Sequence, residues 1–311
     1  MTRDLLIGVD AGTSLIKAVA FDLQGRQLAV ASTPNRVRLA PGGIAEQDMD
    51  ATWADTAATL RALGEKLPGL AQRALALACT AQGDGTWLAD AEGRPVGPAL
   101  LWLDARARRQ AEALRATPAG RSVAERAGNA ITAAMQSSQL LWLREHQPER
   151  LARAATAFHC KDWLFFKATG LRRGSRCESV YTFGNLRTLA YDDATLRELG
   201  LVDLQRLLPE IASRAHEPLS REAAAETGLP EGLPVAATLM DVPLCVLGAG
   251  GLAYEADGRV RRVGCSVLGS TGMHGWISDT PATLVPSAEA GFTIAMPQDE
   301  RLRLRVVSHM A

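Results

Sequence analysis

The stretch that decides the fold is Leu5-Leu-Ile-Gly-Val-Asp10-Ala-Gly-Thr-Ser14, which leads directly into a second apolar run from Leu15 to Phe21. A third segment, Gln27 to Ser32, follows after a short polar turn. Short apolar runs that are separated by tight glycine-containing turns predict consecutive hairpins. We therefore expect the chain to begin with a three-stranded antiparallel meander.

Beyond this meander, helical and extended patterns follow one another. Asp50 is expected to cap a helix that continues to about Leu63. The pattern is largely helical from Ala105 to about Ala168, and Arg173 to Tyr181 reads as polar and irregular. Further strands are expected at residues 74–79, 87–89, 98–103, 235–239, 260–268, 291–296 and 302–307. The glycines and prolines of residues 228–234 make this stretch the best candidate for a domain boundary.

The composition excludes several classes of protein. The 34 Lys and Arg residues balance 34 Asp and Glu residues, so no net charge attracts the chain to nucleic acid or to an anionic membrane. No apolar run reaches the roughly 20 residues of a membrane span, and the N-terminus lacks the order of a signal peptide. The five cysteines are scattered and form no Cys-x-x-Cys pair, which argues against a disulfide framework or a zinc site. We expect a cytoplasmic protein that binds a small molecule.

The turn Asp10-Ala-Gly-Thr13 has the residues of a phosphate-binding hairpin. A glycine lets backbone N–H groups approach an anion, a threonine adds a hydroxyl, and an aspartate can hold a hydrated Mg²⁺. The alternative is an ordinary hairpin turn. A similar turn occurs loosely at Val267-Leu-Gly-Ser-Thr-Gly272, and two such hairpins would together clamp a phosphate chain.

Two other loops have the composition of a sugar pocket. Gln82 and Asp84 lie in a glycine-rich loop after an expected strand, and Trp102 and Asp104 end another. Amides and carboxylates bind vicinal hydroxyl groups, while an indole packs on the C–H face of a polyol. The alternatives are a core aromatic for Trp102 and a turn residue for Asp84.

A series of motifs occurs in the order seen in the FGGY family of carbohydrate kinases, which this sequence resembles. The motifs are Asp10-Ala-Gly-Thr-Ser-Leu-Ile-Lys17, Glu46-Gln-Asp48, Thr80-Ala-Gln-Gly-Asp-Gly85, Trp102-Leu-Asp-Ala-Arg106, Lys161-Asp-Trp163, Leu233-Pro-Val-Ala236, Asp241 with Gly248-Ala-Gly250, and Gly269-Ser-Thr-Gly272. Within the family, Gln82-Gly-Asp-Gly-Thr-Trp87, His159-Cys-Lys-Asp-Trp163 and Thr182-Phe-Gly-Asn185 are most similar to members that act on erythritol.

The resemblance implies an α/β fold of ribonuclease-H-like domains, the type found in the actin, hexokinase and Hsp70 superfamily. Residues 1–235 would form the N-terminal, acceptor-binding domain. Residues 236–311 would begin the C-terminal, nucleotide-binding domain, which we expect to be truncated because family members are longer.

The resemblance also implies roles for individual residues, with ATP and Mg²⁺ as cofactors. Asp241 would be the catalytic base, for which the alternative is a helix N-cap, and Asp10 would be the metal-binding residue. The phosphate-binding residues would be Asp10, Gly12, Thr13, Gly269, Ser270, Thr271 and Gly272. The acceptor-binding residues would be Gln82, Asp84, Trp102 and Asp104.

The activity implied by the resemblance is ATP-dependent phosphorylation of a hydroxyl of a small polyol or ketose. Erythritol is the favoured acceptor, and xylulose or another pentulose is the alternative. A non-catalytic polyol-binding fragment is a further alternative, because the expected adenine-binding loop lies past residue 311. A homodimer is also left open.

Overall fold

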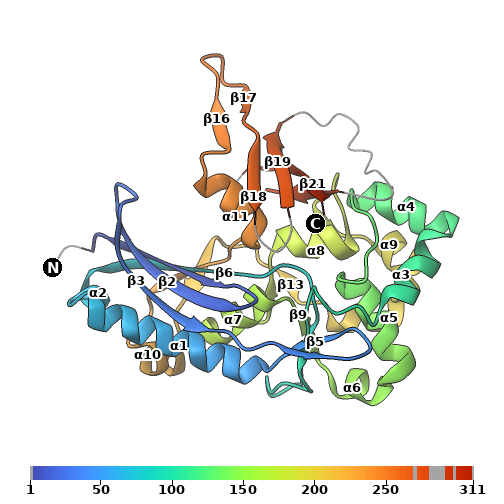
Figure 1. The fold of residues 1–311 in the computed structure, drawn as a ribbon, viewed down its shortest axis with the longest axis horizontal. Coiled ribbons are helices and arrows are strands. Elements are labelled where there is room, and N and C mark those ends of the chain that lie inside the picture. Colours follow the sequence, from blue (N-terminus) through green and yellow to red (C-terminus); the bar gives the residue numbers. More distant parts are fainter. Residues whose placement is uncertain (1–2, 269–271, 280–290, 297–298, 310–311) are drawn as a thin grey trace. The chain divides into compact units, whose positions relative to one another are not determined.

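The computed structural model describes residues 3–268, 272–279, 291–296 and 299–309, and it forms two compact units that interleave along the chain. Unit 1 comprises Met1–Asp104, Glu149–Ser175 and Leu207–Thr238, and unit 2 comprises Ala105–Pro148, Arg176–Arg206 and Leu239–Ala311. Figure 1 traces the described residues in chain order. The expected division between residues 235 and 236 lies beside the last of these crossings. The earlier crossings were not anticipated, and the assignment of residues 1–235 and 236–311 to two functional domains stays a prediction.

The centre of unit 1 is a six-stranded sheet in the order β14-β15-β6-β1-β2-β3. Its strands are β1 (Leu5–Ala11), β2 (Leu15–Asp22), β3 (Gln27–Pro34), β6 (Ala74–Ala81), β14 (His216–Pro218) and β15 (Pro234–Ala236). The first three strands pair antiparallel, as expected, and β6 lies parallel to β1 on its other side. β15 then pairs parallel to β6. An antiparallel meander continued by parallel strands is the ribonuclease-H-like arrangement, so the expected fold class is confirmed.

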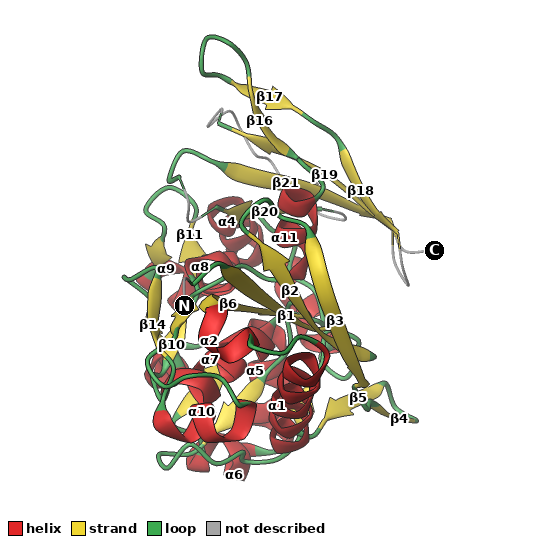
Figure 2. Ribbon diagram, turned by 90° about the vertical axis from the view of Figure 1, so that its left-hand side faces the viewer, coloured by secondary structure: helices red, strands yellow, loops and turns green. Residues whose placement is uncertain are grey.

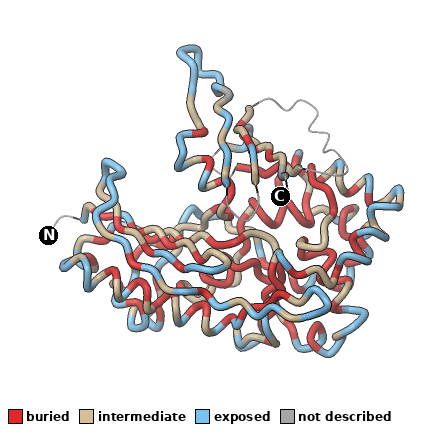
Figure 3. Tube along the Cα trace, in the orientation of Figure 1, coloured by how far each residue is buried: buried red, intermediate tan, exposed pale blue. Residues whose placement is uncertain are grey.

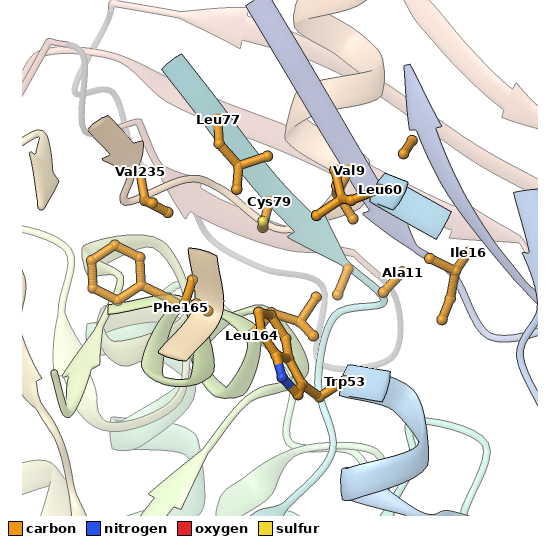
Figure 4. Close-up of a cluster of buried hydrophobic side chains, with 14 of the residues drawn as sticks. Val9, Ala11, Ile16, Trp53, Leu60, Leu77, Cys79, Leu164, Phe165 and Val235 are labelled. Atoms are coloured by element: carbon orange, nitrogen blue, oxygen red, sulfur yellow. The ribbon is translucent and has the colours of Figure 1, made fainter. Parts of the chain in front are cut away.

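One face of this sheet is buried by helices. Helix α1 (Met49–Lys66) packs on β2 and β3, α7 (Cys160–Thr169) packs on β6 and β15, and α10 (Arg221–Thr227) contacts both helices. Figure 2 shows α1 alongside the sheet, and Figure 4 shows the side chains that meet between the two layers. These core side chains include Val9, Ala11, Ile16, Trp53, Leu60, Leu77, Cys79, Leu164, Phe165 and Val235.

The opposite face of the sheet carries alternate residues of the same strands. Leu6, Leu28 and Val30 on this face are each about 40% exposed, within the range 39–44%. The tube of Figure 3 shows this change from buried to exposed residues along β1 and β3. Asp10 belongs to the same series in β1 (Leu6, Gly8, Asp10), so it points away from the helix-covered core.

Smaller elements complete unit 1. They are β4 (Arg38–Ala40), β5 (Ile44–Gln47), α2 (Leu70–Arg73), β7 (Trp87–Ala89), β8 (Ala99–Leu100), α6 (Pro148–Arg153), β9 (Thr156–Phe158), β10 (Arg173–Gly174) and β13 (Glu210–Ile211). The pairings β4-β5-β8, β7-β9 and β10-β13 form three small sheets. The first of these sheets brings β5 and β8 together, and both candidate polyol loops begin or end near β8.

Unit 2 combines helices with an antiparallel sheet in the order β18-β19-β21-β20. Its helices are α3 (Arg108–Arg115), α4 (Pro118–Ala127), α5 (Gln136–His146), α8 (Arg176–Phe183), α9 (Asp193–Glu198), the 3₁₀ helix η1 (Val202–Leu207) and α11 (Asp241–Gly248). Its strands are β11 (Gly184–Asn185), β12 (Ala190–Tyr191), β16 (Leu252–Tyr254), β17 (Val260–Arg262), β18 (Cys265–Leu268), β19 (Gly272–Ser278), β20 (Phe292–Ala295) and β21 (Arg303–His309). Within the described residues, no helix is both long and apolar enough to cross a membrane.

Two local expectations were wrong. The N-cap of α1 is Asp48, whose carboxylate accepts from the Ala51 N–H at 2.9 Å, so Asp50 lies inside the first turn. The segment Arg173–Tyr181 is mostly ordered as β10 and α8. This polar segment contains most of a buried helix, in which Cys177 and Val180 are fully buried. Tertiary packing, which a local pattern does not show, decides this segment.

Candidate functional site

The hairpin between β1 and β2 presents Asp10 at the end of β1. Asp10 pairs with Lys17 across the two strands, and the nearest atoms of their side chains lie 3.8 Å apart. Burial raises the pKa of Asp10, and the neighbouring Lys17 ammonium opposes this shift. The side chain is 40% exposed, so a carboxylate with access to solvent stands next to the turn.

The turn itself leaves backbone donors available. The Gly12 N–H donates to the Leu15 carbonyl at 3.1 Å, and a Cβ on Gly12 would meet that same oxygen at 3.1 Å. The N–H groups of Thr13 and Ser14 make no hydrogen bond with any described residue. A carboxylate beside two available N–H groups and a close-fitting glycine suits a phosphate chain with its metal ion.

The loop after β6 is held in an unusual backbone conformation. Asp84 has φ 56° and Gly85 has φ 82°, both in the left-handed region. A Cβ on Gly85 would come within 2.6 Å of the Leu100 carbonyl oxygen. That oxygen accepts from the Thr86 N–H at 2.8 Å, which ties the loop to β8. The backbone thus requires glycine at position 85, and it sets where the Asp84 side chain starts.

Trp102 and Asp104 lie just after β8 and differ in their surroundings. Asp104 is 1% exposed, and one of its carboxylate oxygens accepts from the Ala45 N–H at 2.9 Å. Trp102 is half-buried, and its indole N–H donates to the Thr13 hydroxyl at 2.9 Å. Asp104 therefore anchors the start of β5, whereas Trp102 joins the segment after β8 to the β1–β2 turn.

A closed ring of hydrogen bonds connects the turn with the loop after β6. The Thr13 hydroxyl donates to Gln82 Oε1 at 3.2 Å, and Gln82 Nε2 donates to Gln47 Oε1 at 2.7 Å. Gln47 Nε2 then donates to the Thr13 carbonyl at 2.8 Å, which closes the ring. The structure thereby brings together Thr13, Gln82 and Trp102 from three of the predicted motifs. Gln47 was missed as a site residue, and the signal for it was the motif Glu46-Gln-Asp48.

The remaining candidates belong to unit 2. Asp241 is the first residue of α11 and Met240 is its N-cap, so the N-cap alternative for Asp241 does not hold. Its carboxylate accepts from the Val242 N–H at 2.8 Å. Gly272 begins β19, which pairs antiparallel with β18. Gly269, Ser270 and Thr271 lie outside the described residues.

A buried ion pair lies elsewhere in unit 1. Lys161 Nζ and a carboxylate oxygen of Asp162 are 2.6 Å apart, and both side chains are almost fully buried. Burial works to raise the pKa of Asp162, but the charge of Lys161 and the contact with His159 outweigh it, so the pKa is lowered. The same carboxylate accepts from the Ser175 N–H at 3.2 Å. Unlike the Thr13 turn, this pair holds α7 and the segment after β10 together and offers no exposed carboxylate.

Three comparisons with known proteins bear on this site. The FGGY family of carbohydrate kinases, N-terminal domain, matches residues 5–248. An erythritol kinase of Brucella abortus is 44% identical over 94% of this chain and 56% of its own length. An L-xylulose/3-keto-L-gulonate kinase of Escherichia coli is 29% identical over 78% of this chain and 50% of its own length.

A solved structure has the same fold. The xylulose kinase of Rhodospirillum rubrum superposes with a TM-score of 0.87 at 23% identity, and the match covers 99% of this chain and 61% of that one. This chain thus spans between half and two thirds of the length of these relatives.

Proposed function

Because this chain belongs to the FGGY family of carbohydrate kinases, we propose that it serves to transfer a phosphoryl group from ATP to a hydroxyl of a small polyol. The observation that supports the proposal is the link from Trp102 through Thr13 to Gln82, which joins the loop proposed to bind the polyol to the turn proposed to bind phosphate. Erythritol is the favoured acceptor, supported by the Brucella abortus relative. Xylulose or another pentulose is the alternative.

For the donor, the proposal uses the β1–β2 turn. Asp10 would hold the hydrated Mg²⁺, and the available N–H groups of Thr13 and Ser14 would bind phosphate oxygens. The magnesium nucleotide supplies the phosphoryl group and offsets the charge that develops on it. The Thr13 hydroxyl donates its proton to Gln82 and accepts from Trp102. We therefore assign the backbone N–H of Thr13 as the donor to phosphate. Residues 269–272 would contribute the second phosphate hairpin.

For the acceptor, the proposal uses the two loops near β8. The exposed part of the Trp102 indole would pack on the C–H face of the polyol, and Asp84 would bind its hydroxyl groups. Gln82 is 3% exposed, so it would act on the acceptor mainly through its hydrogen bond with Thr13, which holds Trp102. Asp104 would act mainly through Ala45, because its side chain is buried.

Asp241 is proposed to be the base that accepts the proton of the attacking hydroxyl. The Asp241→Ala variant should lower turnover by about a thousandfold and leave polyol binding largely intact, since general-base contributions are about 10²–10⁴. Steady-state kinetics together with calorimetric polyol binding would check this. Near-normal turnover would assign the base to another residue.

The test of the function is a substrate panel. ATP, Mg²⁺ and either erythritol, glycerol, xylulose or ribulose are offered to the full chain, and ADP release and polyol binding are both measured. We expect the highest kcat/KM with erythritol. Binding without ADP release would favour a polyol-binding protein without turnover, and the absence of both would overturn the proposal. Cytoplasmic location and a homodimer stay predictions of the sequence.

A further inference from the structure

The orientation of both side-chain amides in the ring follows from one member whose role cannot change, the Thr13 carbonyl. The Thr13 carbonyl can only accept, so Gln47 must turn its Nε2 towards it, at 2.8 Å. Gln47 Oε1 then faces Gln82, which must answer with its own Nε2. Gln82 Oε1 is thereby left to face the Thr13 hydroxyl, which has to donate to it. One backbone carbonyl thus sets the direction of each hydrogen bond.

The consequence falls on Trp102. Because the Thr13 hydroxyl gives its proton to Gln82, its lone pairs remain for a donor, and the Trp102 indole N–H uses one at 2.9 Å. A hydroxyl that turned its proton outward would present that proton to the indole N–H instead. The direction of the hydrogen bonds in the ring therefore decides whether the Thr13 hydroxyl can accept from the Trp102 indole N–H.

Water cannot easily take over these bonds. Gln47 is 1% exposed and Gln82 is 3% exposed. A ring member that is lost would therefore leave buried amide groups without partners, which is more costly than losing the bond alone. The side-chain amide of Gln47 bonds to Thr13 and Gln82, so its effect on Trp102 passes through these two residues.

We propose that Gln47 is a positioning residue, which fixes the proton of the Thr13 hydroxyl and through it the orientation of the Trp102 indole. The proposal rests on the proposed function only in its last step, where Trp102 contacts the polyol. The ring and the indole can be tested without any substrate.

The first experiment is NMR of the indole N–H groups of the full chain. The Trp102 signal is assigned by its loss in a Trp102→Phe variant, because the chain has 6 tryptophans. In Gln47→Glu at pH 8, the carboxylate can still accept from Gln82 Nε2, but it cannot donate to the Thr13 carbonyl and repels it, which moves the Thr13 hydroxyl away from the Trp102 indole. We expect the Trp102 signal to move towards that of a solvated indole, and its hydrogen exchange to become about threefold to tenfold faster.

Lowering the pH distinguishes a positioning role of Gln47 from a merely structural one. The carboxyl group that Gln47→Glu introduces has the shape of the glutamine amide once it is protonated, and it can then donate to the Thr13 carbonyl. Burial disfavours the charged carboxylate, so the pKa of this carboxyl group should be higher than the usual value of about 4.3. The Trp102 signal of Gln47→Glu should thus return towards the wild-type position at pH 5. Gln47→Met loses both bonds of the Gln47 amide without introducing a buried charge, and its Trp102 signal should show no return at pH 5.

The wild-type signal at both pH values is the baseline for this comparison. It is needed because other ionisable residues lie in the same segments as the ring, namely Glu46, Asp48, Asp104 and the Asp10–Lys17 pair. A shift between pH 8 and pH 5 that also occurs in the wild type belongs to these groups. Only the excess in Gln47→Glu reports on position 47.

Asn35 offers a matched control. Its Nδ2 donates to the Gly12 carbonyl at 2.8 Å, one residue before Thr13, but it is not a member of the ring. Asn35 is also buried, at 6% exposed. Asn35→Asp therefore removes an equivalent amide donor from the same turn, and it should leave the Trp102 signal in place.

The second experiment is polyol binding by calorimetry with the same variants. We expect a Kd for erythritol that is about threefold to tenfold higher in Gln47→Glu at pH 8, with recovery at pH 5. A wild-type chain that binds no polyol, with the indole shifts as expected, would refute the proposed function and leave the role of Gln47 intact. An unchanged Trp102 signal in both Gln47→Glu and Gln47→Met would overturn the positioning role, whatever the polyol does.

Discussion

Replacing Gly85 by alanine should destabilise unit 1 far more than the same change at Gly42. Both glycines have a left-handed backbone, with φ 82° and φ 85°, so both variants lose about 1–2 kcal/mol to that conformation. A Cβ on Gly42 meets no atom within 4 Å. A Cβ on Gly85 would lie 2.6 Å from the Leu100 carbonyl oxygen, where ordinary contacts begin at 3.4 Å.

The Leu100 carbonyl has little freedom to move aside. It accepts from the Thr86 N–H at 2.8 Å, and the Leu100 N–H donates back to Thr86 at 3.0 Å. Overpacking of this kind costs about 1–3 kcal/mol. Gly85→Ala should therefore lower the free energy of unfolding by about 2–5 kcal/mol, and Gly42→Ala by about 1–2 kcal/mol. Urea unfolding followed by tryptophan fluorescence measures both. Equal losses in the two variants would refute the argument from the Leu100 contact.

Three further outcomes are expected. Asp48→Ala should lower the free energy of unfolding by about 0.5–2 kcal/mol, since it removes the α1 N-cap; Asp50→Ala, measured in the same urea series, should lose less. Burial raises the pKa of the Cys79 thiol to about 12, so the folded state keeps its proton while an unfolded thiol loses it near pH 9. The free energy of unfolding should fall by about 1.4 kcal/mol per pH unit between pH 9 and about 12, and Cys79→Ala should remove this slope. Lys17→Met removes the positive charge that opposes the effect of burial on the Asp10 pKa, so a carboxyl ¹³C titration should show a still higher Asp10 pKa. An unchanged pKa would mean that Asp10 and Lys17 do not interact in solution.

Much of the fold could be predicted because the signals were local. The meander of β1, β2 and β3 follows from apolar runs and short turns, and each lies within a few residues of the next. The choice between Asp48 and Asp50 as N-cap depends on where the chain leaves β5, which no local pattern contains. Helix α8 was missed because its polar residues are buried by partners that are distant in sequence.

In the candidate site, too, the local motifs could be predicted from the sequence and the contacts between them could not. The motifs around Thr13, Gln82 and Trp102 could be read from the sequence, each as a separate loop. Their connection could not, because Gln82 is held by Gln47 and the Trp102 indole by Thr13 only after β5, β6 and β8 have come together. Whether an amide donates or accepts is likewise a property of its neighbours. The sequence therefore suggests residues, while the hydrogen bonds suggest which of them act on one another.

The pairing of β15 with β6 has a consequence for synthesis on the ribosome. Val235 lies opposite Leu77, so the sheet of unit 1 stays open at β6 until the intervening chain has been made. At about 5–20 residues per second, this delay is about 10–30 s. During that time the nascent protein carries an unpaired strand edge and an uncovered apolar face, which are the features that chaperones bind and that lead to aggregation. Slower translation between β6 and β15 should therefore reduce the yield of folded protein.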